Sequence, residues 1–94
     1  MASDPGEHKL FGMADALVLD ACRPTRGFPV EERYGLQAQI QRAAVSVPAN
    51  IIEASARRTT KDYLYDLTVA LGSASELRTL LGLSRRLGNL ERLA

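Results

Sequence analysis

The sequence contains one cysteine, one histidine, no tryptophan and only 5% aromatic residues. A single cysteine, Cys22, cannot form an intramolecular disulfide, and with a single histidine, His8, it cannot build a Cys/His metal site of the usual spacing. We therefore expect no bound metal or cofactor, and a reducing, cytoplasmic compartment. No run approaches the roughly 18 apolar residues of a membrane span, and the first residues lack a basic segment followed by an apolar one, so neither membrane insertion nor export is expected.

The chain also lacks a strong net charge. Twelve Lys and Arg residues stand against eleven Asp and Glu residues, for a net charge of +1, so the total does not predict attraction to nucleic acid or acidic lipid. Any basic site must be local. The 94 residues are enough for one domain, residues 1–94, but a chain this short buries too little surface to be very stable alone, so self-association is expected.

Catalytic groups are scarce. A hydrolase or transferase needs a nucleophile beside a base, but His8 lies near the N-terminus and Cys22 lies on an apolar helix stripe. We therefore expect no enzymatic activity. Asp62, Asp66 and Glu76 are not accompanied by a histidine at the spacing of bundle metal sites, and we expect them on a solvated helix face.

Three helical patterns organise the chain, at about residues 5–22, 31–58 and 60–87. No alternating strand pattern and no repeat is present, which predicts an all-α fold, an antiparallel up-down helical bundle. The first helix is expected to begin with an N-cap at Asp4, a proline at Pro5 and an acid at Glu7. The third helix is expected to begin with a cap at Thr59 or Thr60 and to end with a C-cap at Gly88 and Asn89.

Several residues inside these patterns need an explanation. Pro48 is expected to kink one long helix rather than divide it, and Phe28 is the one apolar loop residue expected to fill the core. Gly72 and Gly82 each cost about 1 kcal/mol inside a helix, which a close helix crossing would offset. The apolar positions expected to continue the third helix are Leu64, Leu67, Leu71, Ala74, Leu77 and Leu81.

The second pattern has two apolar faces, which need two partners. The first face is Leu36, Ile40, Ala43, Val47, Ile51 and Ala54. The second face, which we expect to be an oligomer interface, is Ala38, Val45, Ala49, Ile52 and Ala56. Between them lies a polar stripe, for which two interpretations stay open: a solvated strip, or a half-buried seam whose neighbours hydrogen-bond along the helix. The polar stripe is Gln39, Arg42, Ser46, Asn50, Glu53 and Arg57.

Basic residues are clustered locally. Arg57, Arg58 and Lys61 lie at the turn into the third helix, where free backbone N–H groups and the helix dipole also favour an anion. Arg78, Arg85 and Arg86 follow toward the end of that helix. Arginine suits bidentate phosphate contacts, so these six residues are the candidate nucleic-acid-binding residues.

Parts of the chain resemble the four-helix bundle proteins encoded in intervening sequences of bacterial 23S ribosomal RNA genes. The resemblance rests on Phe28-Pro29, on Gln39-Ile40-x-Arg42-Ala43-Ala44-Val45-Ser46-Val47-Pro48-Ala49-Asn50-Ile51-x-Glu53, and on Gly72-Ser73-x-x-Glu76-Leu77. It implies an up-down four-helix bundle without enzymatic activity, assembly as a pentamer, and a relation to accessory proteins of diversity-generating retroelements, which bind nucleic acid and a reverse transcriptase. The polar stripe falls on the family pattern.

Two departures from the family pattern are visible. Ala54 stands where the family usually has glycine, so the local packing or bend is expected to differ. Family members continue into a fourth helix, and this chain stops where that helix would begin, so we expect the fourth helix to be absent or truncated and the exposed groove to be covered by a neighbouring subunit or partner.

Two functions follow from the sequence. The first is a homo-oligomer that binds RNA or DNA phosphates through the arginine clusters. The alternative is a protein interaction module, which docks a partner such as a reverse transcriptase without touching nucleic acid and uses its polar stripe only to set the register.

Overall fold

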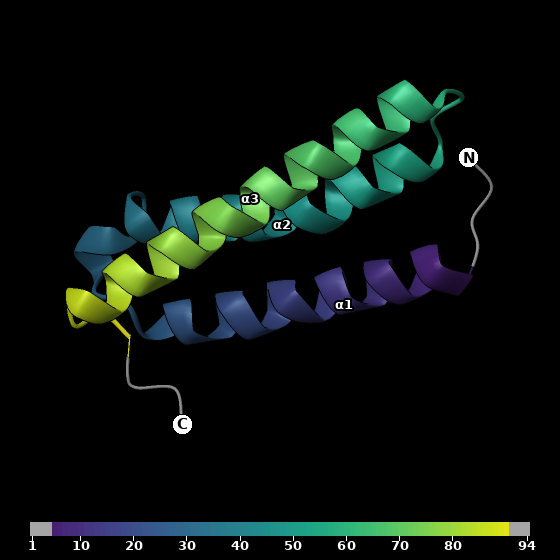
Figure 1. Cartoon of the computed structure of the whole chain (residues 1–94). Helices are drawn as coiled ribbons and strands as arrows, with labels where there is room; N and C mark the ends of the chain where they lie inside the picture. Colours follow the sequence, from purple (N-terminus) through teal and green to yellow (C-terminus); the bar gives the residue numbers. More distant parts are fainter. Residues whose placement is uncertain (1–4, 91–94) are drawn as a thin grey trace.

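The computed structural model describes residues 5–90, apart from the side chains of Pro5 and Glu7, and this part of the chain contains three α-helices and no strand. The all-helical prediction is confirmed. A four-helix arrangement is not seen within the described residues. The elements in chain order are α1 (Pro5–Cys22), the 3-10 turns η1 (Arg23–Gly27) and η2 (Val30–Glu32), α2 (Leu36–Ser55) and α3 (Thr60–Arg86) (Figure 1).

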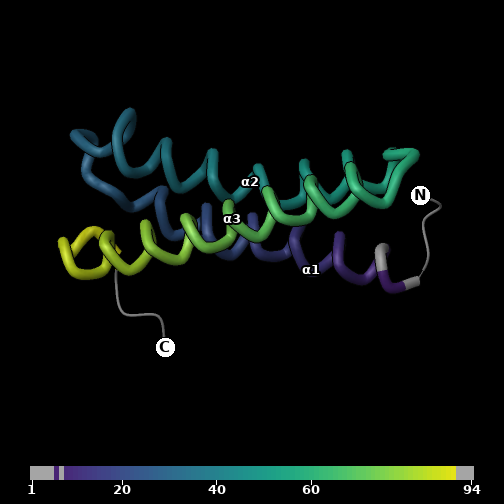
Figure 2. The backbone as a smooth tube through the Cα atoms, turned by 45° about the horizontal axis from the view of Figure 1, so that its top comes forward, coloured from purple at the N-terminus to yellow at the C-terminus, as the bar shows by residue number. Residues whose placement is uncertain are grey.

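α2 lies at the centre of the bundle and packs against both α1 and α3, and successive helices run in opposite directions (Figure 2). Its first apolar face supplies the core, where Ile40, Ala43 and Ala54 are buried. From α1, Ala14 and Ala21 are buried against it. Alanines at these contacts leave room for the larger side chains of the core, among them Phe28, Leu36 and Leu77.

The start of α2 differs from the helix expected over residues 31–58. Residues 30–32 form the separate turn η2, and α2 begins only at Leu36, because Gly35 has a non-helical backbone (φ −104°, ψ −107°). Phe28 is buried in the core, as predicted. The helix ends at Ser55, three residues early. Pro48 lies inside α2, which continues across it as one helix.

The ends of α3 follow the local signals. The Thr59 hydroxyl accepts a hydrogen bond from the backbone N–H of Asp62 at 3.1 Å, which confirms the N-cap. At the other end Gly88 adopts a positive φ of 83°. Its N–H donates to the Arg85 carbonyl, and the Asn89 N–H donates to the Ser84 carbonyl. These two bonds form a Schellman motif, which glycine favours because it lacks a Cβ. The N-cap predicted at Asp4 lies outside the described residues, as does the Glu7 side chain.

The apolar series expected along α3 faces the core only in part: Leu77 is buried and Leu67, Ala74 and Leu81 pack against the core. Leu64 and Leu71 are 54% and 69% exposed. Asp66, two residues after Leu64, points inward instead, and two residues correspond to a rotation of about 200° around a helix. The glycines are also not at a close crossing, because a Cβ built on Gly72 or Gly82 would meet no atom within 4 Å. The residues of α3 that are buried are Asp66, Ala70, Leu77, Leu80 and Ser84.

Candidate functional site

Part of the polar stripe forms a seam between α2 and α3. The hydroxyls of Ser46 and Ser73 are 2.8 Å apart, which joins the two helices directly. On α2, the Asn50 side-chain amide donates to the Ser46 carbonyl at 2.7 Å and to the Ser46 hydroxyl at 3.0 Å. All three side chains are partly buried. The half-buried interpretation therefore holds for this stretch, where small polar groups satisfy one another at the helix contact.

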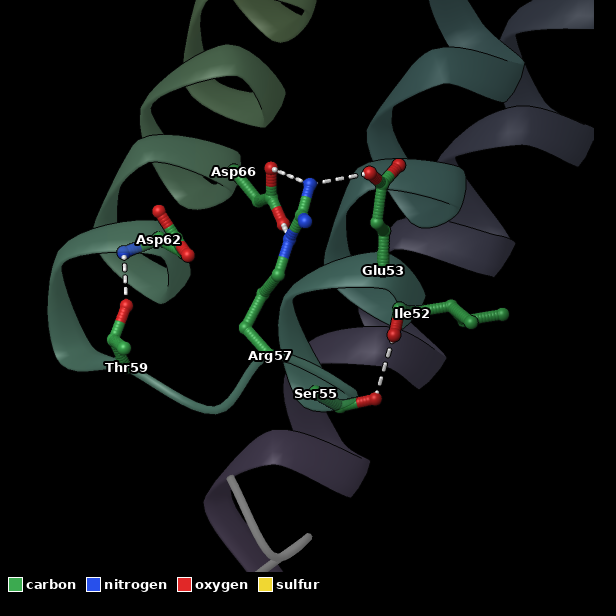
Figure 3. A network of polar contacts seen from close by, with 7 residues as sticks. All are labelled: Ile52, Glu53, Ser55, Arg57, Thr59, Asp62 and Asp66. Carbon is green, nitrogen blue, oxygen red and sulfur yellow. Dashed lines mark hydrogen bonds and ion pairs between the residues drawn. The ribbon is translucent and has the colours of Figure 1, made fainter.

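The seam continues into an ion-pair network at the α2–α3 turn (Figure 3). Arg57 Nε donates to Asp66 Oδ2 at 2.6 Å and Arg57 Nη2 donates to Asp66 Oδ1 at 3.3 Å, so the guanidinium engages both carboxylate oxygens. Arg57 Nη2 also donates to Glu53 Oε1 at 2.6 Å. The pKa of Arg57 is raised, chiefly by the hydrogen bond with Asp66, with the charges of Asp66, Glu53 and Asp62 adding to it.

Asp66 corrects the expectation of a solvated acidic face. Asp66 is only 2% exposed. A carboxylate that is removed from water needs a charged or hydrogen-bonding partner. Arg57, nine residues earlier in the chain, supplies that partner. The pair closes the turn between α2 and α3, and it means that the Arg57 guanidinium is already occupied by carboxylates of the same chain.

The other members of the polar stripe behave differently. Gln39 and Arg42 are exposed, so the solvated interpretation holds at the first turns of α2. Gln41, which the sequence did not single out, is partly buried instead and donates to the Thr25 hydroxyl at 3.2 Å. Thr25 is fully buried, and its hydroxyl also donates to the Cys22 carbonyl at 2.6 Å. These bonds anchor η1 to α2.

The candidate nucleic-acid-binding residues do not form one patch. Arg58 and Lys61 are exposed at the α2–α3 turn, whereas Arg85 and Arg86 are exposed at the far end of α3 (Figure 1). Along the outer side of α3, a shallow hollow of about 420 Å³ lies between these ends. The side chains and glycine that line it are Ser75, Arg78, Thr79, Gly82 and Arg86. It combines two guanidinium groups with two hydroxyls and has no carboxylate in its lining, a composition that suits a phosphate.

The second apolar face of α2 is largely uncovered within the chain. Val45, Ala49 and Ala56 are exposed and Ile52 is 55% exposed, while Ala38 is half-buried. Neither α1 nor α3 packs on these exposed positions. This face therefore presents a continuous apolar stripe to solvent.

A second apolar surface lies between α1 and α3. A groove of about 380 Å³ has Leu17 of α1 on one side and Leu77 and Leu81 of α3 on the other. Arg78 and Arg85 line it as its charged members, and the buried Leu90 lies at its end. The groove is large enough to accept side chains from a partner.

Within residues 5–90, no cluster of three or more His, Cys, Asp or Glu side chains is placed to hold a metal ion. No helix in this part of the chain combines the length and the apolar character needed to cross a bilayer. Comparison with curated proteins gave no significant match. A family model described as 23S rRNA-intervening sequence protein matches residues 7–93.

Proposed function

The chain belongs to the 23S rRNA-intervening sequence protein family, and from this premise we propose that it is a non-enzymatic helical-bundle protein that self-associates and binds nucleic-acid phosphates. The observation that carries the proposal is the hollow on the outer side of α3, where Arg78 and Arg86 flank the hydroxyl-bearing residues Ser75 and Thr79. Charge-assisted hydrogen bonds from guanidinium groups to phosphate are roughly twice as strong as hydrogen bonds between neutral groups.

The basic residues differ in how readily a phosphate could reach them. Arg57 is bonded to Asp66 and Glu53, so a phosphate would have to compete with two carboxylates for it. Arg58 and Lys61 are exposed beside it and are the better candidates at the turn. With Arg78, Arg85 and Arg86, they form the set that we assign to phosphate contacts.

Self-association would occur through the second face of α2. An exposed stripe of Val45, Ala49 and Ile52 on a central helix costs solubility unless another molecule covers it. The family resemblance makes a pentamer the expected assembly. A ring of identical subunits repeats each basic hollow by symmetry, so a site that is weak in one chain becomes a multivalent surface.

The test is nucleic-acid binding measured by fluorescence anisotropy over a series of salt concentrations. The double variant Arg78→Gln/Arg86→Gln should bind more weakly and should lower the slope of log affinity against log salt by about 0.7 to 0.9 per lost phosphate contact. Arg42→Gln, an exposed arginine outside the hollow, is the matched control. Wild-type affinity and slope in the double variant would refute the assignment of the hollow.

The groove between α1 and α3 favours a second candidate function, that of a protein interaction module. Its apolar walls, Leu17, Leu77 and Leu81, and its rim arginines, Arg78 and Arg85, suit an amphipathic helix with acidic residues. A reverse transcriptase is the partner that the resemblance implies. Under this alternative, purified protein binds no oligonucleotide at any salt concentration but retains a protein partner, and Leu81→Glu abolishes the retention.

A further inference from the structure

One end of the bundle gathers arginines from segments that are far apart in the sequence. The α1–α2 connection contains Arg23, Arg26 and Arg33, and all three are exposed. α3 ends at the same end of the bundle with the exposed Arg85 and Arg86, as both backbone views show (Figure 1, Figure 2).

A side-chain hydrogen bond fixes this arrangement. The Asn89 amide, just after α3, donates to Glu32 Oε2 of η2 at 2.8 Å, across 57 positions of sequence. In addition, Phe28, Leu36 and Leu90 belong to one buried cluster. The connection and the end of α3 are therefore held against each other by both a polar and an apolar contact.

The charge balance differs between the two ends. At the connection end, five arginines face three carboxylates, Asp20, Glu31 and Glu32, and Glu32 is already bonded to Asn89. At the α2–α3 turn, Arg57, Arg58 and Lys61 are matched by three carboxylates. The three carboxylates are Glu53, Asp62 and Asp66. Among the described residues, positive charge is thus in excess at the connection end and balanced at the turn, although the net charge of the chain is only +1.

The α1–α2 connection also contains an exposed aromatic residue. Tyr34 is 89% exposed and follows Arg33 directly in the chain. An exposed aromatic ring adds nothing to the packing of the bundle. At a positively charged end, however, the ring can serve as a stacking platform for an unpaired base. Proteins that bind single strands combine a positively charged path for the backbone with aromatic side chains for the bases.

We propose that the connection end of the bundle binds a single-stranded nucleic acid, with Arg23, Arg26 and Arg33 on the phosphates and Tyr34 stacked on a base. This inference rests on the proposed function and specifies the ligand as a single strand. Arg85 and Arg86 extend the path from this end onto α3, toward the hollow at Arg78. RNA and DNA share the chemistry that the site recognises, and duplexes lack the exposed base faces that Tyr34 requires.

The first experiment tests the base contact. The full chain is titrated into a labelled single-stranded RNA, the DNA of the same sequence, and the corresponding DNA duplex. Tyr34→Ala should weaken single-strand binding by roughly tenfold, the lower range for loss of one stacked base, and Tyr34→Phe should restore it because the ring remains. Equal affinity of wild type, Tyr34→Ala and Tyr34→Phe for the single strands would overturn the proposal, as would tighter binding of the duplex. Comparison of the RNA and DNA affinities identifies the source of the strand.

The second experiment separates this site from the proposed function as a whole. Arg26→Gln/Arg33→Gln at the connection end is compared with Arg58→Gln/Lys61→Gln at the turn, which removes the same charge. Arg26→Gln/Arg33→Gln should lower the salt slope by about 1.4, since each single-strand phosphate contact contributes about 0.7. A loss confined to Arg58→Gln/Lys61→Gln would overturn the connection site and leave nucleic-acid binding intact. Absence of binding by the wild type would overturn both proposals, and unchanged circular dichroism verifies the fold of each variant.

Discussion

Arg57, just after α2, holds the buried carboxylate of Asp66 on α3 through two hydrogen bonds, of which the shorter is 2.6 Å. The partners are nine residues apart, too far for a contact within one helix. They therefore connect two helices across the turn. With Asp66 turned toward Arg57, Leu64 and Leu71 lie on the exposed side of α3.

Asp66→Asn should lower the free energy of unfolding by about 1 to 3 kcal/mol, because the buried group loses its charge-assisted bonds while its polar atoms stay away from water. Urea denaturation followed by circular dichroism measures the loss. Glu76→Gln, an exposed acid on the same helix, is the control and should change little. If Asp66→Asn were as stable as Glu76→Gln, a structural role for the Arg57–Asp66 pair would be contradicted.

The Ser46 and Ser73 hydroxyls should be energetically coupled across the helix contact. Each single alanine variant removes one partner of the 2.8 Å bond, and a double-mutant cycle isolates their interaction. We expect a coupling energy of about 1 kcal/mol. Strictly additive losses in Ser46→Ala, Ser73→Ala and the double variant would show that the hydroxyls do not stabilise each other.

Replacement of glycine by alanine should stabilise the protein at Gly72 and destabilise it at Gly88. Gly72 lies in the interior of α3 with open space around its missing Cβ, so Gly72→Ala should stabilise the protein by about 1 kcal/mol. Gly88 has a positive φ, which strains an alanine, so Gly88→Ala should destabilise it by about 1 kcal/mol. Thermal unfolding compares the two. Destabilisation by Gly72→Ala would indicate that another subunit covers this side of α3.

The second face of α2 should be the surface that holds copies together. Ile52→Glu should reduce the native mass measured by light scattering, because a carboxylate would be buried in the interface. Ala49→Glu should have the same effect. Leu64→Glu is a matched control, since Leu64 on α3 is as exposed as Ile52, 54% against 55%. An unchanged mass for Ile52→Glu, or equal dissociation by Leu64→Glu, would exclude this interface.

Burial raises the pKa of the Cys22 thiol. A raised pKa lowers the fraction of thiolate at a given pH, and the thiolate is the species that reacts. At mildly alkaline pH the folded protein should therefore be alkylated more slowly than the same protein in urea. Time courses with iodoacetamide measure both rates. Equal rates in the two states would show that the fold does not protect the thiol.

Local sequence signals predicted the features that depend on a few neighbouring residues. Thr59 caps α3 because its hydroxyl reaches a backbone N–H three residues later, and Gly88 ends the same helix because it tolerates a positive φ. The apolar pattern of α2 also predicted the face that supplies the core, while the partner of its second face stays a prediction. Each of these outcomes follows from geometry within a few turns of one helix.

Long-range contacts decided what the local patterns left open. Whether a polar stripe is solvated depends on where α3 runs, so Asn50 and Arg57 entered a seam while Gln39 and Arg42 stayed in water. η2 is held by Asn89, which lies 57 positions from Glu32 in the sequence.

By itself, then, the sequence determined the helical class, the capped ends of α3 and the two-faced character of α2, because these depend on backbone geometry and on residues within a turn or two. Only the tertiary structure decided that Asp66 is buried against Arg57 and that Arg33 and Arg85 share one end of the bundle. The physical reason is that helix rotation and side-chain pairing across a turn minimise the free energy of the whole packed chain, to which residues far apart in sequence contribute together.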